Sequence, residues 1–243
     1  WLFSSFINFN IIIQDLNLSK EQTQSLYSSI EVAKKNAKEL KPWLLNRNWV
    51  IWTPFETKLA MQRQAEMALP QVMTADCLGP WGIYLDGVSK NHMMTISTGV
   101  LIRSLFNYGF YDQGINLLSH LNRNFSRVSP GTWQEMNPDY GCFMQAWTNY
   151  GYEIGIVEGL WGIKVDAISS NVFVNPAPSH YLEGTQIKNV RVFDGIFSLA
   201  CKNNTMYVTK AFEGNLFVGK QKISSDGSLE LPWPHDRFIP SRF

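Results

Sequence analysis

The sequence predicts an α+β protein in which a helical part precedes an antiparallel β part. Before about residue 167, apolar residues recur at three- and four-residue steps, which is the spacing of one helix face. After Ile163, short segments rich in β-branched and aromatic residues are separated by Gly, Asn and Asp, which is typical of strands joined by turns. We therefore predict two domains, residues 1–166 and residues 167–243.

The helical part is predicted to contain six helices that pair as three hairpins. Ser19 and Gln22 form a capping box at the start of the second helix, and Thr53 with Pro54 marks the start of the third. Short connections make paired helices antiparallel neighbours, and a ring of such hairpins gathers its loops at one end, where a functional site is expected. The six predicted ranges are 1–16, 19–41, 53–70, 93–108, 112–124 and 143–160.

Two details of this helical part are also predicted. A long loop over residues 76–87 should follow the third helix, because it contains a Gly-Pro and an Asp-Gly turn pair. In the fifth helix, Ile115, Leu118 and Leu121 are expected to face inward.

The β part is predicted from its short apolar segments. Tyr207 and Phe217 are expected in its core. Its Asn, Lys and Ser residues suit turns and solvent-facing positions, so we expect it to support the helical part and not to bind substrate. The predicted strands cover residues 172–174, 189–193, 196–201, 206–211 and 216–223.

The composition excludes several classes of function. With 21 basic and 20 acidic residues the formal net charge is +1, so no overall field would attract nucleic acid or an anionic membrane. Cys77, Cys142 and Cys201 are far apart without a CxxC spacing, and no His has a Cys, Asp or Glu at ligand spacing. We therefore predict no metal site, no cofactor and no nucleic-acid partner.

The chain opens with the apolar run Trp1–Ile13, which has no basic leader and no small-residue cleavage site. Polar residues interrupt the run, and it is shorter than the roughly 20 apolar residues that span a bilayer. We expect a helix of a larger protein, with neither a signal peptide nor a membrane span. Asn17, Asn124 and Asn203 begin glycosylation triplets that matter only in a secreted eukaryotic protein, and a secreted or extracytoplasmic location is the one we favour.

The segment Pro130–Thr148, with the sequence PGTWQEMNPDYGCFMQAWT, resembles the late-barrel signature of the six-hairpin glycosidases. Relatives in that superfamily include bacterial α-L-rhamnosidases, amylo-α-1,6-glucosidase-like debranching proteins and processing α-glucosidases. The resemblance covers roughly residues 43–178 and implies the C-terminal half of an (α/α)6 toroid, made of three helical hairpins, followed by an antiparallel β-sandwich. The other landmarks, in chain order, are Trp49–Pro54, Gly79–Tyr84, Thr95–Gly99 and Gly159–Ile163.

Glu135 matches the superfamily's catalytic general base, which activates water for attack at the anomeric carbon with inversion. The resemblance implies that the general acid lies before the first residue of this chain, and Asp76 or Asp86 would have to replace it if the chain acted alone. The chemistry agrees, because inverting hydrolysis needs two carboxyl groups about 6.5–9.5 Å apart. A structural alternative is that Glu135 only interacts with the N-terminus of the next helix.

Other residues at the same loop end are candidate sugar contacts, since aromatic rings stack on sugar faces and amides bond to hydroxyls. For the Trp residues the alternative is core packing. For Asp139 it is a turn, since the residue lies in a turn composition in which Asp commonly bonds its own backbone. The candidates are Trp49, Trp52, Trp81, Trp133, Asp139, Tyr140, Gln145 and Trp147.

Glycoside hydrolysis of an oligo- or polysaccharide is therefore the leading functional hypothesis, with Glu135 as general base. The alternative is a catalytically inactive carbohydrate-binding or structural protein of the same fold, and a third is an unrelated helical toroid that binds lipid or peptide. Half a ring exposes an apolar seam, which predicts that an upstream fragment or companion chain completes it. Without that partner we expect the chain to be inactive.

Overall fold

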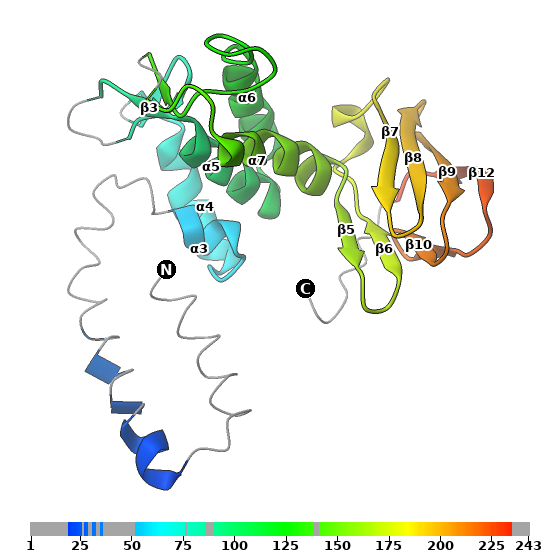
Figure 1. Ribbon diagram of the computed structural model, residues 1–243, viewed down its shortest axis with the longest axis horizontal. Coiled ribbons are helices and arrows are strands. Elements are labelled where there is room, and N and C mark those ends of the chain that lie inside the picture. Colours follow the sequence, from blue (N-terminus) through cyan, green and yellow to red (C-terminus); the bar gives the residue numbers. More distant parts are fainter. Residues whose placement is uncertain are drawn as a thin grey trace. The chain divides into compact units, whose positions relative to one another are not determined.

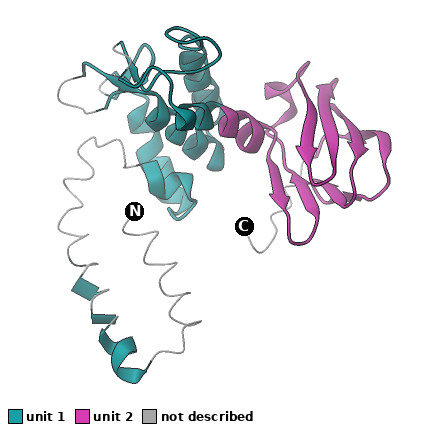
Figure 2. Ribbon diagram, viewed as in Figure 1, with its two compact units in different colours: residues 1–152 teal, residues 153–243 magenta. Residues whose placement is uncertain are grey.

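A computed structural model describes residues 19–25, 27–28, 31–32, 35, 52–75, 77–85, 90–138 and 141–234. The chain divides into two compact units, residues 1–152 and residues 153–243, which are treated separately (Figure 2). Helices dominate the first unit and strands the second, so the predicted α+β class is confirmed (Figure 1). The half-toroid arrangement and the boundary at residues 166/167 stay predictions.

The capping box at the start of the second predicted helix is confirmed. The backbone N–H of Ser19 donates to Gln22 Oε1 at 2.9 Å, and the N–H of Gln22 donates to Ser19 Oγ at 3.2 Å. Helix follows at once over residues 20–25. The first predicted helix lies outside the described residues. The described part of the chain contains no helix long and apolar enough to cross a membrane.

The third predicted helix is two helices, α3 (Thr53–Glu56) and α4 (Gln62–Val72), so its prediction as a single helix was wrong. Lys58 adopts a left-handed conformation with φ 59°, and the N–H groups of Leu59 and Ala60 both turn back to the carbonyl of Pro54. This local closure ends α3 after one turn. Pro70 does not end α4, which continues two residues further.

The remaining helices of the first unit begin and end near their predicted positions. They are α5 (Thr95–Asn107), α6 (Tyr111–Asn122) and α7 (Ala146–Ile154), and a π-helical segment, Gly155–Leu160, follows α7 directly. Leu118 and Leu121 are buried as expected, whereas Ile115 is only half-buried and Leu117 takes the inward position. Helix α5 is buried around most of its circumference.

Helices α5 and α7 touch through two glycines. A Cβ atom placed on Gly99 would lie 2.1 Å from the Cα of Gly151, and one placed on Gly151 would lie 2.2 Å from the Cα of Gly99. Strand β3 (Met93–Met94) directly precedes α5, and strand β4 (Met136–Asn137) lies in the segment before α7. The two strands pair with each other, so the segments that lead into the two helices are joined. The glycine contact and this strand pair hold the loop containing Glu135 against the start of α5.

Within the predicted loop over residues 76–87, a short hairpin forms from β1 (Leu78–Gly79) and β2 (Gly82–Ile83). The N–H of Ile83 donates to Thr98 Oγ1 at 3.0 Å, and His120 Nδ1 lies 3.2 Å from the carbonyl oxygen of Gly79. The hairpin is therefore attached to both α5 and α6.

The second unit consists of two four-stranded sheets (Figure 1). One has the order β11-β10-β6-β5 and the other the order β12-β9-β8-β7, with every pair antiparallel except β6 and β10. Strands β5 and β12 were not predicted. The strands are β5 (Ile163–Asp166), β6 (Asn171–Val174), β7 (Gln186–Val192), β8 (Gly195–Lys202), β9 (Thr205–Ala211), β10 (Asn215–Val218), β11 (Gln221–Ile223) and β12 (Gly227–Pro232).

The expectation that Tyr207 lies in the core was wrong. Side chains alternate across β9, and because Met206 and Val208 are buried, Tyr207 lies on the opposite face with 38% of its surface exposed. Phe217 is half-buried and stacks on Phe173, with ring centroids 5.1 Å apart.

Candidate functional site around Glu135

Glu135 is fixed by three hydrogen bonds. Its carbonyl accepts the N–H of Thr95 at 2.9 Å, its own N–H donates to the carbonyl of Cys142 at 2.9 Å, and its Oε2 accepts the N–H of Cys142 at 2.9 Å. The residue is half-buried. Oε1 accepts no hydrogen bond and the carboxylate forms no ion pair among the described residues, so one oxygen is anchored and the other is available.

Gly141 packs directly against this carboxylate. Its φ of +55° lies in the left-handed region, and a Cβ atom there would be 2.9 Å from Glu135 Oε2. Any larger residue would be strained and would push against the anchored oxygen. The glycine is therefore part of the geometry that holds Glu135.

Trp133 lies in the core. It is 5% exposed, its indole N–H donates to the carbonyl of Leu121 at 2.8 Å, and its ring packs against those of Phe125 and Tyr152, with centroids 4.6 and 4.8 Å away. A ring enclosed in this way has no face for a sugar. The packing alternative therefore describes Trp133 better than the stacking one.

Trp52 and Trp81 differ from each other. Trp52 is buried beside Phe55, which also favours packing. Trp81 is partly buried, and the guanidinium of Arg127 lies 4.6 Å from the centroid of its ring and covers one face. This cation–π contact is the described interaction of the Trp81 ring.

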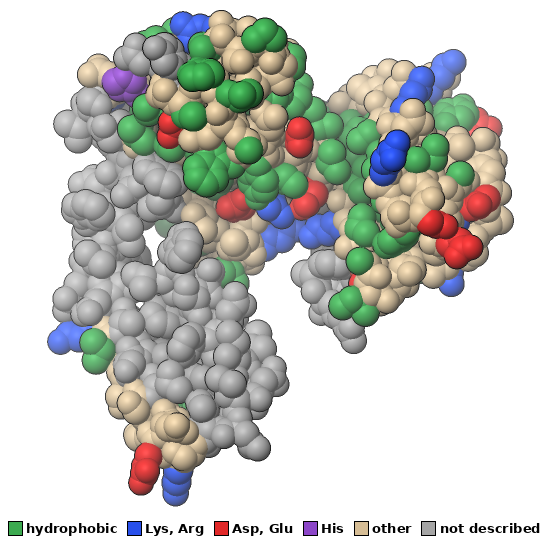
Figure 3. Space-filling model, in the orientation of Figure 1, with side chains coloured by type: hydrophobic (Ala, Val, Ile, Leu, Met, Phe, Trp, Pro, Cys, Tyr) green, Lys and Arg blue, Asp and Glu red, His purple; other side chains and the backbone are tan. Residues whose placement is uncertain are grey.

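Gln145 and Trp147 flank the first residue of α7. The side chain of Trp147 is 64% exposed, and Phe143 and Met144 nearby in the chain are exposed as well, at 55% and 60%. Hydrophobic side chains are exposed at several places on the molecule, and Figure 3 shows those on one of its faces in green. The stretch after Glu135 thus presents an aromatic ring that is open to solvent.

The predicted contacts Trp49, Asp139 and Tyr140, like the substitute acids Asp76 and Asp86, lie outside the described residues. Their roles stay predictions. The structure therefore describes Glu135 with five of the eight predicted sugar-contact residues.

A polar network beside Glu135 was not predicted. Arg127 Nη1 donates to Asn137 Oδ1 at 2.9 Å and to the carbonyl of Pro138 at 3.2 Å, and Gln134 Nε2 donates to the same Asn137 Oδ1. Gln134 and Asn137 are fully buried. The sequence did contain a signal for this network. Gln134 and Asn137 both lie in the segment Pro130–Thr148, and amide side chains that become buried need hydrogen-bond partners.

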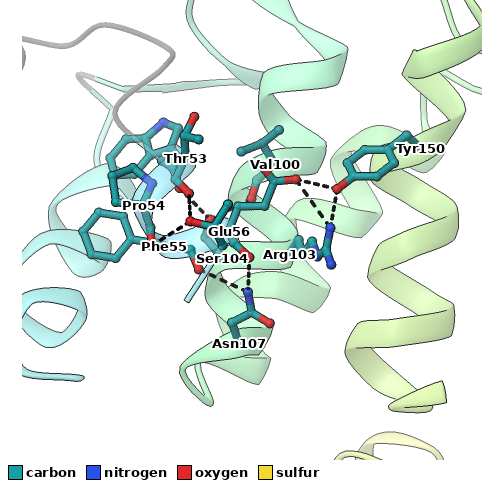
Figure 4. Close-up of polar contacts among 11 residues, drawn as sticks. Thr53, Pro54, Phe55, Glu56, Val100, Arg103, Ser104, Asn107 and Tyr150 are labelled. Atoms are coloured by element: carbon teal, nitrogen blue, oxygen red, sulfur yellow. Dashed lines mark hydrogen bonds and ion pairs between the residues drawn. The ribbon is translucent and has the colours of Figure 1, made fainter. Parts of the chain in front are cut away.

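A second network lies along the helices, at α3, α5 and α7 (Figure 4). Arg103 Nη1 donates to the hydroxyl of Tyr150, that hydroxyl donates to Glu56 Oε1, and the guanidinium lies 3.7 Å from the same carboxylate oxygen. Burial, and then the hydrogen bond to Glu56, raise the pKa of Tyr150 to about 12. Since each residue comes from a different helix, the network fixes the three helices to one another.

This network predicts a loss of stability at high pH. The folded pKa of Tyr150 lies above the usual value of 10, so its stabilising effect is complete below pH 10 and is lost as the pH rises towards 12. We expect Tyr150→Phe to lower the free energy of unfolding by about 1 kcal/mol at pH 8 and to flatten its decline above pH 10. Urea unfolding of both proteins at pH 8, 10 and 11 measures this, and equal pH dependence in the two would contradict it.

Among the described residues, no group of three or more His, Cys, Asp or Glu side chains is arranged to hold a metal ion. The three cysteines are free thiols: Cys201 is buried, Cys77 is partly buried and Cys142 is exposed.

No protein-family model matches the sequence, and no curated protein matches it. Among solved structures, the chain is similar to a putative kojibiose phosphorylase from the human microbiome, with 12% sequence identity and a TM-score of 0.39. The match covers 74% of this chain and 21% of that protein, so this chain spans about a fifth of its length.

Proposed function

We propose that this chain supplies the water-activating carboxylate of an inverting glycoside hydrolase, with Glu135 as the general base. The observation that carries the proposal is the asymmetry of its carboxylate: Oε2 is held by the N–H of Cys142, while Oε1 accepts no hydrogen bond from the described residues. A general base needs this combination of a fixed position and a free lone pair. The resemblance of the segment Pro130–Thr148 to the six-hairpin signature supports the same role.

In the proposed reaction, Glu135 Oε1 takes a proton from a water molecule as the water oxygen attacks the anomeric carbon. A second carboxyl group protonates the departing glycosidic oxygen, so the anomeric configuration inverts. The resemblance locates this acid before Trp1, and we propose that an upstream or companion polypeptide contributes it. This chain by itself is then inactive.

The ring of Trp147 is exposed and fits sugar stacking, and Trp81 remains a proposed contact. Trp49, Asp139 and Tyr140 remain proposed contacts, and Gln145 remains a proposed hydrogen-bonding residue. Trp52 and Trp133 are left out of the binding surface, because both rings are buried.

The test is the stereochemistry of hydrolysis by the assembly that contains both carboxyl groups. Oligosaccharides of glucose, mannose and rhamnose, in both anomeric linkages, are incubated with it, and proton NMR follows the first product before mutarotation. We expect the configuration opposite to that of the substrate. Product with retained configuration would overturn the mechanism, and sugar binding without any turnover would favour the non-catalytic alternative.

A further inference from the structure

The structure distinguishes two of the glycosylation triplets in the sequence. The triplet that begins at Asn203 lies in the second unit, where β8 turns into β9, and the one that begins at Asn124 follows α6 in the first unit (Figure 1). The triplet at Asn17 lies outside the described residues. An N-linked glycan is attached to the side-chain nitrogen of Asn and is bulky, so the burial of that nitrogen decides which triplet a folded chain can use.

The triplet at Asn203 occupies the tip of a hairpin. Asn203 and Asn204 form the two-residue turn between β8 and β9, and both are exposed. Their φ angles of 52° and 57° lie in the left-handed region, which asparagine adopts more readily than most residues and which tight hairpin turns require. The third residue of the triplet, Thr205, is the first residue of β9.

The backbone of this turn is held in place, whereas the Asn203 side chain is not. The N–H of Asn203 donates to Glu183 Oε1 at 2.7 Å, and the N–H of Asn204 donates to Glu183 Oε2 at 3.4 Å. With the described residues, Asn203 forms hydrogen bonds only through its backbone. Its side-chain amide is therefore exposed and open to reaction.

Asn124 is the opposite case. The residue is 0% exposed, and its Nδ2 donates to the carbonyl of Trp81 at 3.3 Å and to the carbonyl of His120 at 3.4 Å. A glycan would replace one of the two hydrogens that these bonds use, and a large polar group would have to fit inside the protein. A chain with a glycan at Asn124 therefore could not adopt this fold.

We propose that Asn203 accepts an N-linked glycan in the lumen of a eukaryotic secretory compartment, and that Asn124 stays unmodified in the folded chain. Nδ2 of Asn203 forms a bond to the anomeric carbon of a lipid diphosphate-linked oligosaccharide. The bond from that carbon to the diphosphate oxygen breaks, the diphosphate leaves with the electron pair, and one amide proton is released. The inference does not depend on Glu135 being a catalytic base, since this triplet lies in the other unit.

Glycan mapping tests the proposal. The full chain, preceded by a secretion signal, is produced in cultured eukaryotic cells and purified from the medium. Peptide:N-glycosidase in heavy-oxygen water converts each glycosylated Asn into heavy-labelled Asp, which mass spectrometry of the peptides locates. We expect the label at Asn203 and none at Asn124. A secreted chain with an unmodified Asn203, or with a glycan on Asn124, would overturn the proposal.

Two substitutions of Thr205 show whether the triplet is the acceptor. Thr205→Ala removes the required hydroxyl and keeps Asn203, whose left-handed backbone favours asparagine. This variant should lose the heavy label and the shift in gel mobility that one glycan causes. Thr205→Ser keeps the hydroxyl and should retain both. A glycan at Asn203 in both variants, or in neither, would contradict the assignment.

The measurement does not require the chain to leave the cell. If the chain is retained, the same mapping is made on a detergent extract of the cells. Transfer takes place in the lumen, so the label is expected at Asn203 there as well. Its absence would overturn the proposal in the same way.

Discussion

Replacing Gly99 with alanine should destabilise the protein by about 3 kcal/mol, at the upper end of the range for overpacked cores. The added methyl group would lie 2.1 Å from the Cα of Gly151, a backbone atom that cannot rotate away. Helices α5 and α7 would therefore have to separate. This strain exceeds the gain of about 1 kcal/mol that alanine normally brings over glycine within a helix. The free energy of unfolding in urea measures the net effect.

Two other substitutions serve as comparisons for Gly99→Ala. In Gly114→Ala the new methyl group meets the ring of Phe106 at 2.4 Å, and since a side chain can shift, the loss should be smaller. Asn116→Ala changes an exposed position of α6 and should alter stability by only a few tenths of a kcal/mol. A Gly99→Ala variant no less stable than Asn116→Ala would mean that the two helices do not touch as described.

Glu135→Gln should reduce glycosidase activity of the complete assembly by about 10²- to 10⁴-fold, the usual contribution of a general base. The amide oxygen of Gln can still accept the N–H of Cys142, so the segment should keep its position. A neutral amide cannot take the proton from water. We expect kcat to fall, while sugar affinity and unfolding free energy stay close to those of the unaltered assembly.

The matched control is Glu153→Gln, which makes the same chemical change at an exposed position of α7. It should leave activity unchanged. If both variants retained full activity in an assembly that hydrolyses its substrate, Glu135 would not be the base. If Glu135→Gln lost activity together with a large part of its folding free energy, the residue would be structural.

Much of the fold could be predicted because its causes are local. The periodicity of residues 93–108 and 112–124 gave α5 and α6 to within a few residues, and the reciprocal side-chain bonds of Ser19 and Gln22 followed from their spacing. The break between α3 and α4 was missed, since Lys58 has no sequence feature that marks a left-handed residue. Strand β12 was missed although Ser228–Leu231 alternates polar and apolar residues, because the segment is short and lies between Gly227 and Pro232, two residue types that are uncommon in strands.

For the site, the sequence by itself determined which residue types stand near Glu135 and in what order, because the motif is a continuous stretch of chain. Tertiary structure decided how these side chains are buried and which atoms they contact. Burial encloses Trp133 while Trp147 stays open, the loop return to Cys142 fixes one carboxylate oxygen, and the pairing of Met93 with Asn137 joins two distant segments. The pairing of Met93 with Asn137 joins segments that are far apart in the chain, and the bond from Cys142 depends on the local backbone conformation. Residue spacing along the sequence specifies neither.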